Sequence, residues 1–275
     1  MSLLPLDLPP NAVALLGVPS DENSSLLRGP AAAPAVIRSA LFDPGVNLST
    51  EGSVDLFREN RFVDLGDITI DPADRAGNVE RIVTEVSAVI ERGARVLALG
   101  GDHAVAYPLV RANAEQRGPV AIVQIDAHPD LYDDFEGNPL SHACPFARIM
   151  ESKLATRLVQ IGIRAATPHQ REQAERFGVE TVSVEGGVRR ADLPAGPVYL
   201  SLDLDGLDPA FAPGVSHPEA GGLSTRQVIE IIHALPGPIV GADVVELNPR
   251  RDVAGATAIV AAKLAKEVAG RMLEA

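Results

Sequence analysis

Six side chains that suit metal ions stand in three short blocks of this 275-residue chain, and each block follows an apolar run. They are His103, then Asp126, His128 and Asp130, and then Asp203 with Asp205. The preceding runs are short, β-branched or leucine-rich, and bounded by Gly or Pro, which is typical of strands buried on both faces. Because ligands bind outside the carboxyl ends of the strands in an open parallel sheet, the three blocks are predicted to meet in one crevice.

The six residues indicate a metal site only when they are taken together, because a single aspartate after a strand usually caps a helix or shapes a turn. Burying four carboxylates together is prohibitively costly without cations, since like charges cannot all stay ionised. The block from Asp126 to Asp130 is the most specific, because alternate positions of an extended segment project to one side. Four carboxylates and two imidazoles form a hard, oxygen-rich set that suits Mn²⁺ better than a cysteine-rich zinc site would. The pattern therefore predicts a hydrolytic metalloenzyme.

The chain resembles the ureohydrolases, the arginase and agmatinase family of manganese enzymes, in the blocks G-G-D-H-A, D-A-H-P-D and S-L-D-L-D-G-L-D-P. The segment D-V-V-E-L-N-P at residues 243–249 fits the same family pattern. Three further segments resemble the plant-type arginases most: N-S-S-L-L-R-G-P near the start, residues 126–143, and A-P-G-V-S-H-P-E-A-G-G-L-S. The resemblance runs from about Gly17 nearly to the C-terminus, and its metal motifs are far more specific than its substrate-reading segments.

The resemblance implies two Mn²⁺ ions per chain. One ion would be held by His103, Asp126, Asp130 and Asp203, and the other by His128, Asp126, Asp203 and Asp205. Asp126 and Asp203 would therefore bridge the pair, and Asp130 would help to orient a shared water. Two cations lower the pKa of such a water from 15.7 towards roughly 7, which supplies a nucleophile at neutral pH.

The substrate that the resemblance implies is a guanidinium, whose central carbon is deactivated by delocalisation. Catalysis then needs a strong nucleophile, an anion that holds the planar cation, and a proton source for the leaving amine. Glu246 can supply the anion through a paired hydrogen bond, and His142 is the candidate proton shuttle. Asn138 and Ser141, in the same loop as His142, are further candidates for substrate binding.

The identity of the guanidino compound follows less directly from the residues. Asp133, Asp134 and Glu136 would attract a cationic tail and repel a carboxylate, so we expect agmatine, which would give putrescine and urea. Arginine, hydrolysed to ornithine and urea, is the alternative, together with another guanidino compound or formiminoglutamate, which would release formamide. The polar side chains available for a carboxylate are not compelling: Asn23, Ser24, Ser25, Arg28, Asn138 and Ser141.

Three other classes of protein remain to be weighed. Single-zinc deacetylases share the fold but lack a counterpart to His103, and a non-catalytic assembly module would have lost ligands. The Gly100-Gly101 pair could indicate a nucleotide-binding loop, but the chain has neither of the motifs typical of such loops, G-x-G-x-x-G and G-K-[ST]. His217 lies in a segment that could line the pocket, whereas Cys144 is expected to pack because no general base is placed for it.

The elements that would position these residues alternate between strand and helix. Strand-like runs recur at residues 13–18, 62–65, 96–99, 120–125, 158–163, 179–184, 198–202 and 239–244. Helical periodicity covers residues 34–41, 79–90, 103–115, 169–176, 225–235 and 253–273. This alternation predicts a three-layer α/β/α fold with a central, mainly parallel sheet. We also expect a capping box at Ser224 and Gln227, pocket-rimming loops at 129–141 and 206–222, and an apolar core stripe on the last helix formed by Ala256, Ile259, Val260, Leu264, Val268 and Met272.

Length, composition and charge limit the number of domains, the partners and the cellular location that we expect. The length and a 46% hydrophobic fraction fit a single domain over residues 1–275, without a repeat or linker. A net charge of −13 disfavours nucleic acid and anionic membranes as partners and mildly favours a cationic small substrate. The start lacks a basic, apolar leader, no apolar run reaches membrane-span length, and there is one cysteine, so we expect a bacterial, cytoplasmic setting. The resemblance implies a homo-oligomer, either trimer or hexamer.

Overall fold

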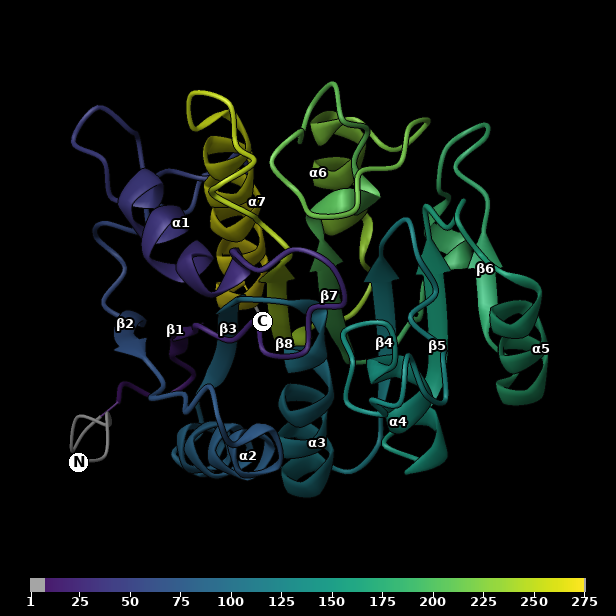
Figure 1. The fold of residues 1–275 in the computed structure, drawn as a ribbon. Coiled ribbons are helices and arrows are strands. Elements are labelled where there is room, and N and C mark those ends of the chain that lie inside the picture. Colours follow the sequence, from purple (N-terminus) through teal and green to yellow (C-terminus); the bar gives the residue numbers. More distant parts are fainter. Residues whose placement is uncertain (1–7, 275) are drawn as a thin grey trace.

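The computed structural model describes residues 8–274, which form helices around an eight-stranded sheet (Figure 1). The strands are β1 (Val13–Val18), β2 (Phe62–Asp67), β3 (Arg95–Gly100), β4 (Val120–Ile125), β5 (Ala155–Ile161), β6 (Glu180–Val182), β7 (Val198–Asp203) and β8 (Ile239–Val245). Their order across the sheet is β2-β1-β3-β8-β7-β4-β5-β6, and every pairing among them is parallel. The expected parallel sheet is therefore confirmed.

Helices cover both faces of this sheet (Figure 1). They are α1 (Ala33–Leu41), α2 (Arg75–Glu91), α3 (Ala106–Arg117), α4 (Pro145–Glu151), α5 (Pro168–Phe177), α6 (Thr225–Ala234) and α7 (Ala256–Leu273). On one face α7 contacts α1 and α6, and on the other α3 contacts α2 and α4. Successive residues of β1 point to opposite faces, so Leu15 joins the core beneath α1 and α7 while Leu16 joins the core beneath α2 and α3. The architecture is the expected three-layer α/β/α sandwich.

The order of the strands creates the crevice in which ligands bind in folds of this kind. β3 and β4 follow one another in the chain, but β8 and β7 lie between them in the sheet. The carboxyl ends of β3, β8, β7 and β4 are consequently neighbours, and connections leave them in different directions. Such a switch point leaves a crevice outside the strand ends. All three metal-type blocks, and Glu246 as well, follow these four strands.

The Gly100-Gly101 pair has a packing role at this edge. A Cβ on Gly101 would come within 1.7 Å of the Ser20 carbonyl oxygen, and one on Gly100 within 2.5 Å of a Val245 methyl. The absence of side chains lets Asp102 N–H donate to Ser20 O at 2.8 Å and lets Gly101 O accept from Glu246 N–H at 2.9 Å. The two glycines thus draw the ends of β1, β3 and β8 together.

Several elements differ in detail from the prediction. The seven-residue helix α4 was not expected, because it is too short to show a helical period. The stretch beginning at His103 opens with a 3₁₀ turn, and α3 proper begins only at Ala106. The capping box is present, since the Ser224 side chain accepts from Gln227 N–H.

The stripe expected on the last helix is wrong in its first turns. Ile259 is 62% exposed, and the buried face there is formed by Thr257, Ala258 and Ala261. Ile259 precedes the buried Val268 by nine residues, which is about two and a half turns of an α-helix, so the two side chains point to opposite sides of α7. From Leu264 onward the expected residues are buried. Between residues 8 and 274, no helix is both long and apolar enough to span a membrane.

Candidate metal centre and substrate pocket

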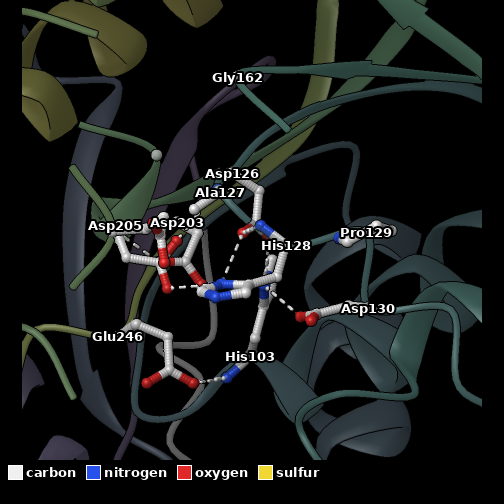
Figure 2. A network of polar contacts seen from close by, with 12 residues as sticks. His103, Asp126, Ala127, His128, Pro129, Asp130, Gly162, Asp203, Asp205 and Glu246 are labelled. Carbon is white, nitrogen blue, oxygen red and sulfur yellow. Dashed lines mark hydrogen bonds and ion pairs between the residues drawn. The ribbon is translucent and has the colours of Figure 1, made fainter. Parts of the chain in front are cut away.

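The structure brings the six predicted metal-type residues together at the carboxyl ends of three strands (Figure 2). Five of them contribute nitrogen or oxygen atoms to two groups within ligand distance, His103 with Asp126 and Asp203, and Asp126 with His128 and Asp205. Asp130 lies outside both groups, with its Oδ2 3.0 Å from His103 Nδ1. In each group the candidate ligand atoms lie within 4.8 Å of one another. Asp126 belongs to both groups, which is the position that a bridging carboxylate would take.

His103 provides the sharpest test of whether these residues fit a cation. Its Nδ1 lies 3.1 Å from Asp126 Oδ2, 3.0 Å from Asp130 Oδ2 and 3.1 Å from Asp203 Oδ2. This atom is buried, yet it makes no hydrogen bond with any residue that the structure describes. Buried polar atoms are nearly always paired. A nitrogen that faces three carboxylate oxygens without a hydrogen bond is therefore suited to a metal ion.

The opposite edge of the His103 ring fixes which nitrogen faces the carboxylates. Its Nε2 lies 2.9 Å from Ser201 Oγ, and Ser201 donates its own proton to Asp243 Oδ1 at 2.8 Å. The hydroxyl can then only accept from Nε2–H, so the neutral ring keeps a lone pair on Nδ1. Tyr199 also donates to Asp243, at 2.7 Å. These buried hydrogen bonds fix the orientation of the His103 ring, as hydrogen bonds to the second ring nitrogen commonly do for histidines that bind a metal ion.

The electrostatics of the carboxylates agree with a cation site. Burial and the charge of Asp126 raise the pKa of Asp130 to about 6 and that of Asp205 to about 7. Burial and the neighbouring carboxylates raise the pKa of Asp203 well above its ordinary value. For Asp126 burial acts in the same direction, but contacts with His103 and His128 outweigh it and lower the pKa. The protein groups alone cannot keep all four carboxylates ionised, and divalent cations would remove this conflict.

Two buried glutamines brace the block that follows β4, and the sequence pattern did not single them out. Gln124 Nε2 donates to Asp126 Oδ2 at 2.7 Å and to the His128 carbonyl oxygen at 3.1 Å. Gln160 Nε2 donates to Gln124 Oε1 at 2.7 Å and to the Pro129 carbonyl oxygen at 2.8 Å. A polar residue inside an otherwise apolar strand was the only available signal.

Glu246 and His142 form a second polar cluster beside the first. Glu246 Oε1 accepts from His103 N–H at 2.8 Å and lies 2.8 Å from His142 Nδ1. Burial lowers the pKa of His142, but the charge and hydrogen bond of Glu246 outweigh it and raise the value to about 9. Glu246 and Asp130 have φ angles of +66° and +51°, a strained region for non-glycine residues that concentrates at functional sites.

Ser25 supplies partners for both protonation states of His142. Its N–H donates to His142 Nε2 at 3.2 Å when that nitrogen is unprotonated, and its Oγ lies 2.8 Å from the same atom. The hydroxyl oxygen can accept the Nε2 proton of the charged ring. An imidazole held in both states is suited to proton transfer.

A cavity joins these clusters to the surface. Its lining includes Ser25, His128, Asp130, Tyr132, Phe135, His142, Ala165, Thr167, Gln170, His217 and Glu246. Both loops expected at the rim contribute. Ser25, named from the sequence as a possible donor to a carboxylate, does line the cavity, whereas the contribution of the segment 165–170 was missed because nothing in its local sequence marks it.

Asn138 and Ser141, expected to bind substrate, do not line this cavity. Asn138 Nδ2 donates to Asn23 Oδ1 at 3.3 Å, and Asn138 Oδ1 accepts from Leu140 N–H at 3.0 Å. Ser141 is buried, and its Oγ lies 3.5 Å from the Asn23 carbonyl oxygen. Both residues tie the His142 loop to the segment that follows β1, so they shape the pocket from outside.

Two of the three acidic side chains that were expected to attract a cationic substrate tail already have partners in the protein. We call Asp133, Asp134 and Glu136 the acidic rim. Asp133 pairs with His169 at 2.9 Å, and Asp134 accepts from Gly137 N–H at 2.7 Å within its own turn. None of Asp133, Asp134 and Glu136 is among the cavity-lining residues. A substrate inside the cavity would therefore not contact these three carboxylates directly, which weakens the basis for expecting a purely cationic substrate tail.

Comparison with known proteins gives a consistent result. The model of the family described as "Arginase family" matches residues 11–270. Arginase 1, mitochondrial, of Arabidopsis thaliana is 47% identical over 277 residues, which cover 95% of this chain and 81% of that protein. Agmatinase, mitochondrial, of Gallus gallus is 36% identical over 93% of this chain and 79% of its own length. The solved arginase from Medicago truncatula superposes with a TM-score of 0.89 at 44% identity, covering 95% of this chain and 87% of that one.

These relatives also correct the expected location. Both curated relatives are named as mitochondrial proteins, which contradicts the cytoplasmic setting expected from the sequence. That expectation rested in part on the first residues of the chain, and residues 1–7 lie outside the described part of the structure.

Proposed function

Because this chain belongs to the arginase family, we propose that it hydrolyses L-arginine to L-ornithine and urea. The observation that carries the proposal is the pairing of Glu246 with His142 beside the two candidate metal groups, in one cavity. Arginine replaces the agmatine that the sequence favoured. Its support is 47% identity to a plant arginase, against 36% to an agmatinase, and an acidic rim that is already engaged.

The proposed cofactor is a pair of Mn²⁺ ions. His103, Asp126, Asp130 and Asp203 would hold one, and Asp126, His128, Asp203 and Asp205 the other. The hard oxygen-rich donors and the unpartnered Nδ1 of His103 support this choice. When bound there, the ions would lower the pKa of a water shared between them, as paired metals do in hydrolases.

The chain's own residues divide the remaining work. Glu246 holds the guanidinium through Oε2, because Oε1 is already occupied by His103 N–H and His142. As the water oxygen bonds to the guanidinium carbon and the bond to the side-chain nitrogen breaks, the oxygen gives up both of its protons to become the carbonyl oxygen of urea. The leaving nitrogen gains two protons, one of which comes from an acid. His142 delivers this proton, with Ser25 holding Nε2 before and after the transfer.

The substrate assignment predicts a ranking of rates. With saturating Mn²⁺, the specificity constant for urea release from L-arginine should exceed those for agmatine and 4-guanidinobutyrate by at least about tenfold, or roughly 1.4 kcal/mol. The three substrates are compared at matched concentrations, with acetate release from acetyl-lysine and formamide release from formiminoglutamate as controls. A higher constant for agmatine would reinstate the sequence-based preference, and release of formamide or acetate alone would replace the proposed reaction.

We also propose that the chain assembles into a homo-oligomer, a trimer or hexamer as its family resemblance implies. Light scattering at working concentration should return a multiple of the 28.9 kDa chain mass. A monomer mass would contradict the proposal.

A further inference from the structure

A buried histidine nitrogen without a partner lies beside the substrate pocket. The His217 side chain lines the cavity together with His142 and Glu246, and its buried Nε2 makes no hydrogen bond within the described part of the chain. Its ring centroid lies 5.2 Å from that of His142 and 6.3 Å from that of His128. Buried polar atoms are nearly always paired. An unpaired nitrogen at the wall of a ligand pocket indicates a partner that arrives with the ligand.

The hydrogen-bonding capacity of Glu246 shows what is missing from the pocket. A carboxylate oxygen has two lone pairs, and both lone pairs of Oε1 are taken by His103 N–H and His142 Nδ1–H. Within residues 8–274 no hydrogen bond reaches Oε2, so Glu246 has one oxygen to offer. A guanidinium presents several N–H donors in a rigid plane and is normally held by two acceptors at once. One carboxylate oxygen cannot form that fork.

We propose that His217 is the second acceptor for the substrate guanidinium, taking one N–H on its imidazole while Glu246 Oε2 takes another. This inference rests on the proposed function, because it deepens the recognition of a guanidino substrate. The Cβ–Cγ torsion of histidine is soft, so the ring can turn a nitrogen into the cavity that it already lines.

The two proposed acceptors, Glu246 and His217, lie on segments that pair with each other. Val215 forms an antiparallel bridge with Leu247, the residue after Glu246. Asn248 N–H donates to Gly214 O at 2.7 Å, and Asn248 Nδ2 donates to Ser216 Oγ at 2.9 Å. The segment that ends at His217 is therefore fixed to the segment that carries Glu246.

The local charges favour an accepting, neutral ring at this position. Burial and the charge of His142 lower the pKa of His217, whereas Glu246 opposes them. A cationic ring would repel the guanidinium, and a neutral ring keeps a lone pair for it.

The test compares His217 variants that keep or lose the acceptor. His217→Leu and His217→Ala lose it, and His217→Gln keeps an acceptor oxygen on a side chain of similar reach. In the Mn²⁺-loaded enzyme, we expect the first two to lower kcat/KM for arginine by about 10- to 100-fold, the scale of one hydrogen bond to a charged group. The inhibition constant of guanidinium chloride should rise by a similar factor, and His217→Gln should recover much of both losses. His169→Leu, at an exposed histidine on the rim, is the matched control and should change neither value.

The outcomes separate this inference from the proposed function. The role of His217 alone would be overturned if the wild-type enzyme releases urea and the leucine and alanine variants behave like it. In that case their kcat/KM for arginine and their inhibition constants for guanidinium would stay within about twofold of the wild-type values. Wild-type enzyme that releases no urea from any guanidino compound would overturn the proposed function. Calorimetric binding of guanidinium chloride to wild type and variants would then still decide the role of His217. Metal content and thermal unfolding identify a variant that misfolds, and the alanine variant then replaces the leucine variant.

Discussion

Replacing Asp126 by asparagine is expected to remove most hydrolysis and most bound metal, and Asp203→Asn should act in the same way. Asp126 belongs to both candidate metal groups, and Asp203 lies in the group that surrounds His103. Each change keeps the shape of the side chain but deletes a charge on which two cations would depend. Loss of an outer partner alone typically costs 10- to 100-fold in metal affinity or activity, so loss of a shared ligand should exceed about 100-fold. Metal analysis per chain and urea release measure the two effects.

A matched control lies on the rim, where Asp133→Asn removes a carboxylate outside the cavity lining. This variant should keep its metal and its activity. A wild-type protein that retains a single tightly bound Zn²⁺, and that gains no activity from Mn²⁺, would contradict the two-metal centre.

Stability provides a second readout for Asp203→Asn. Burial and neighbouring carboxylates raise the folded-state pKa of Asp203, so its ionised form destabilises the metal-free protein once the pH is above the ordinary carboxyl pKa. At pH 7 the metal-free variant should therefore unfold at a higher temperature than metal-free wild type. The order should reverse when Mn²⁺ is added, because only wild type gains fully from binding the ions. Thermal unfolding with and without Mn²⁺ measures both signs.

The sheet and the metal cluster could be predicted because both follow from local patterns. A short β-branched run between glycines or prolines identifies a buried strand, and a residue directly after a strand lies at its carboxyl end. His103, Asp126 and Asp203 therefore converge for reasons visible in the sequence. The stripe expected on α7 was wrong at Ile259 because positions four residues apart drift around a helix of 3.6 residues per turn, so the first members lie far from the face that carries Val268.

The walls of the pocket were harder to predict because they depend on contacts between distant segments. Ser25 reaches His142 across 117 positions, and no local pattern encodes that contact. Asn138 and Ser141 stand beside His142 in sequence, but the turn directs their polar atoms to Asn23. The prediction of agmatine from the acidic rim failed for a similar reason. The charge of a side chain is visible in the sequence, but its partner, such as His169 for Asp133, is not.

Replacing His142 by alanine is expected to lower turnover by roughly 10²- to 10⁴-fold, the range of general acid catalysis, with a smaller change in KM. The guanidinium keeps Glu246 Oε2, because His142 occupies only the other oxygen. The charged ring carries the proton that the leaving amine needs, and the pKa of His142 is raised to about 9. Turnover of wild type should therefore persist up to about that pH and fall as the pH rises through it.

The alanine variant should lose this alkaline limb, and added imidazole should restore part of the rate. His169→Ala, which removes an exposed histidine from the rim, should leave both the rate and the pH profile unchanged. A His142→Ala enzyme with near-normal turnover and the wild-type pH profile would remove His142 from the mechanism. The proton for the leaving amine would then have to come from another group on the cavity wall, of which His128 and His217 are the remaining imidazoles.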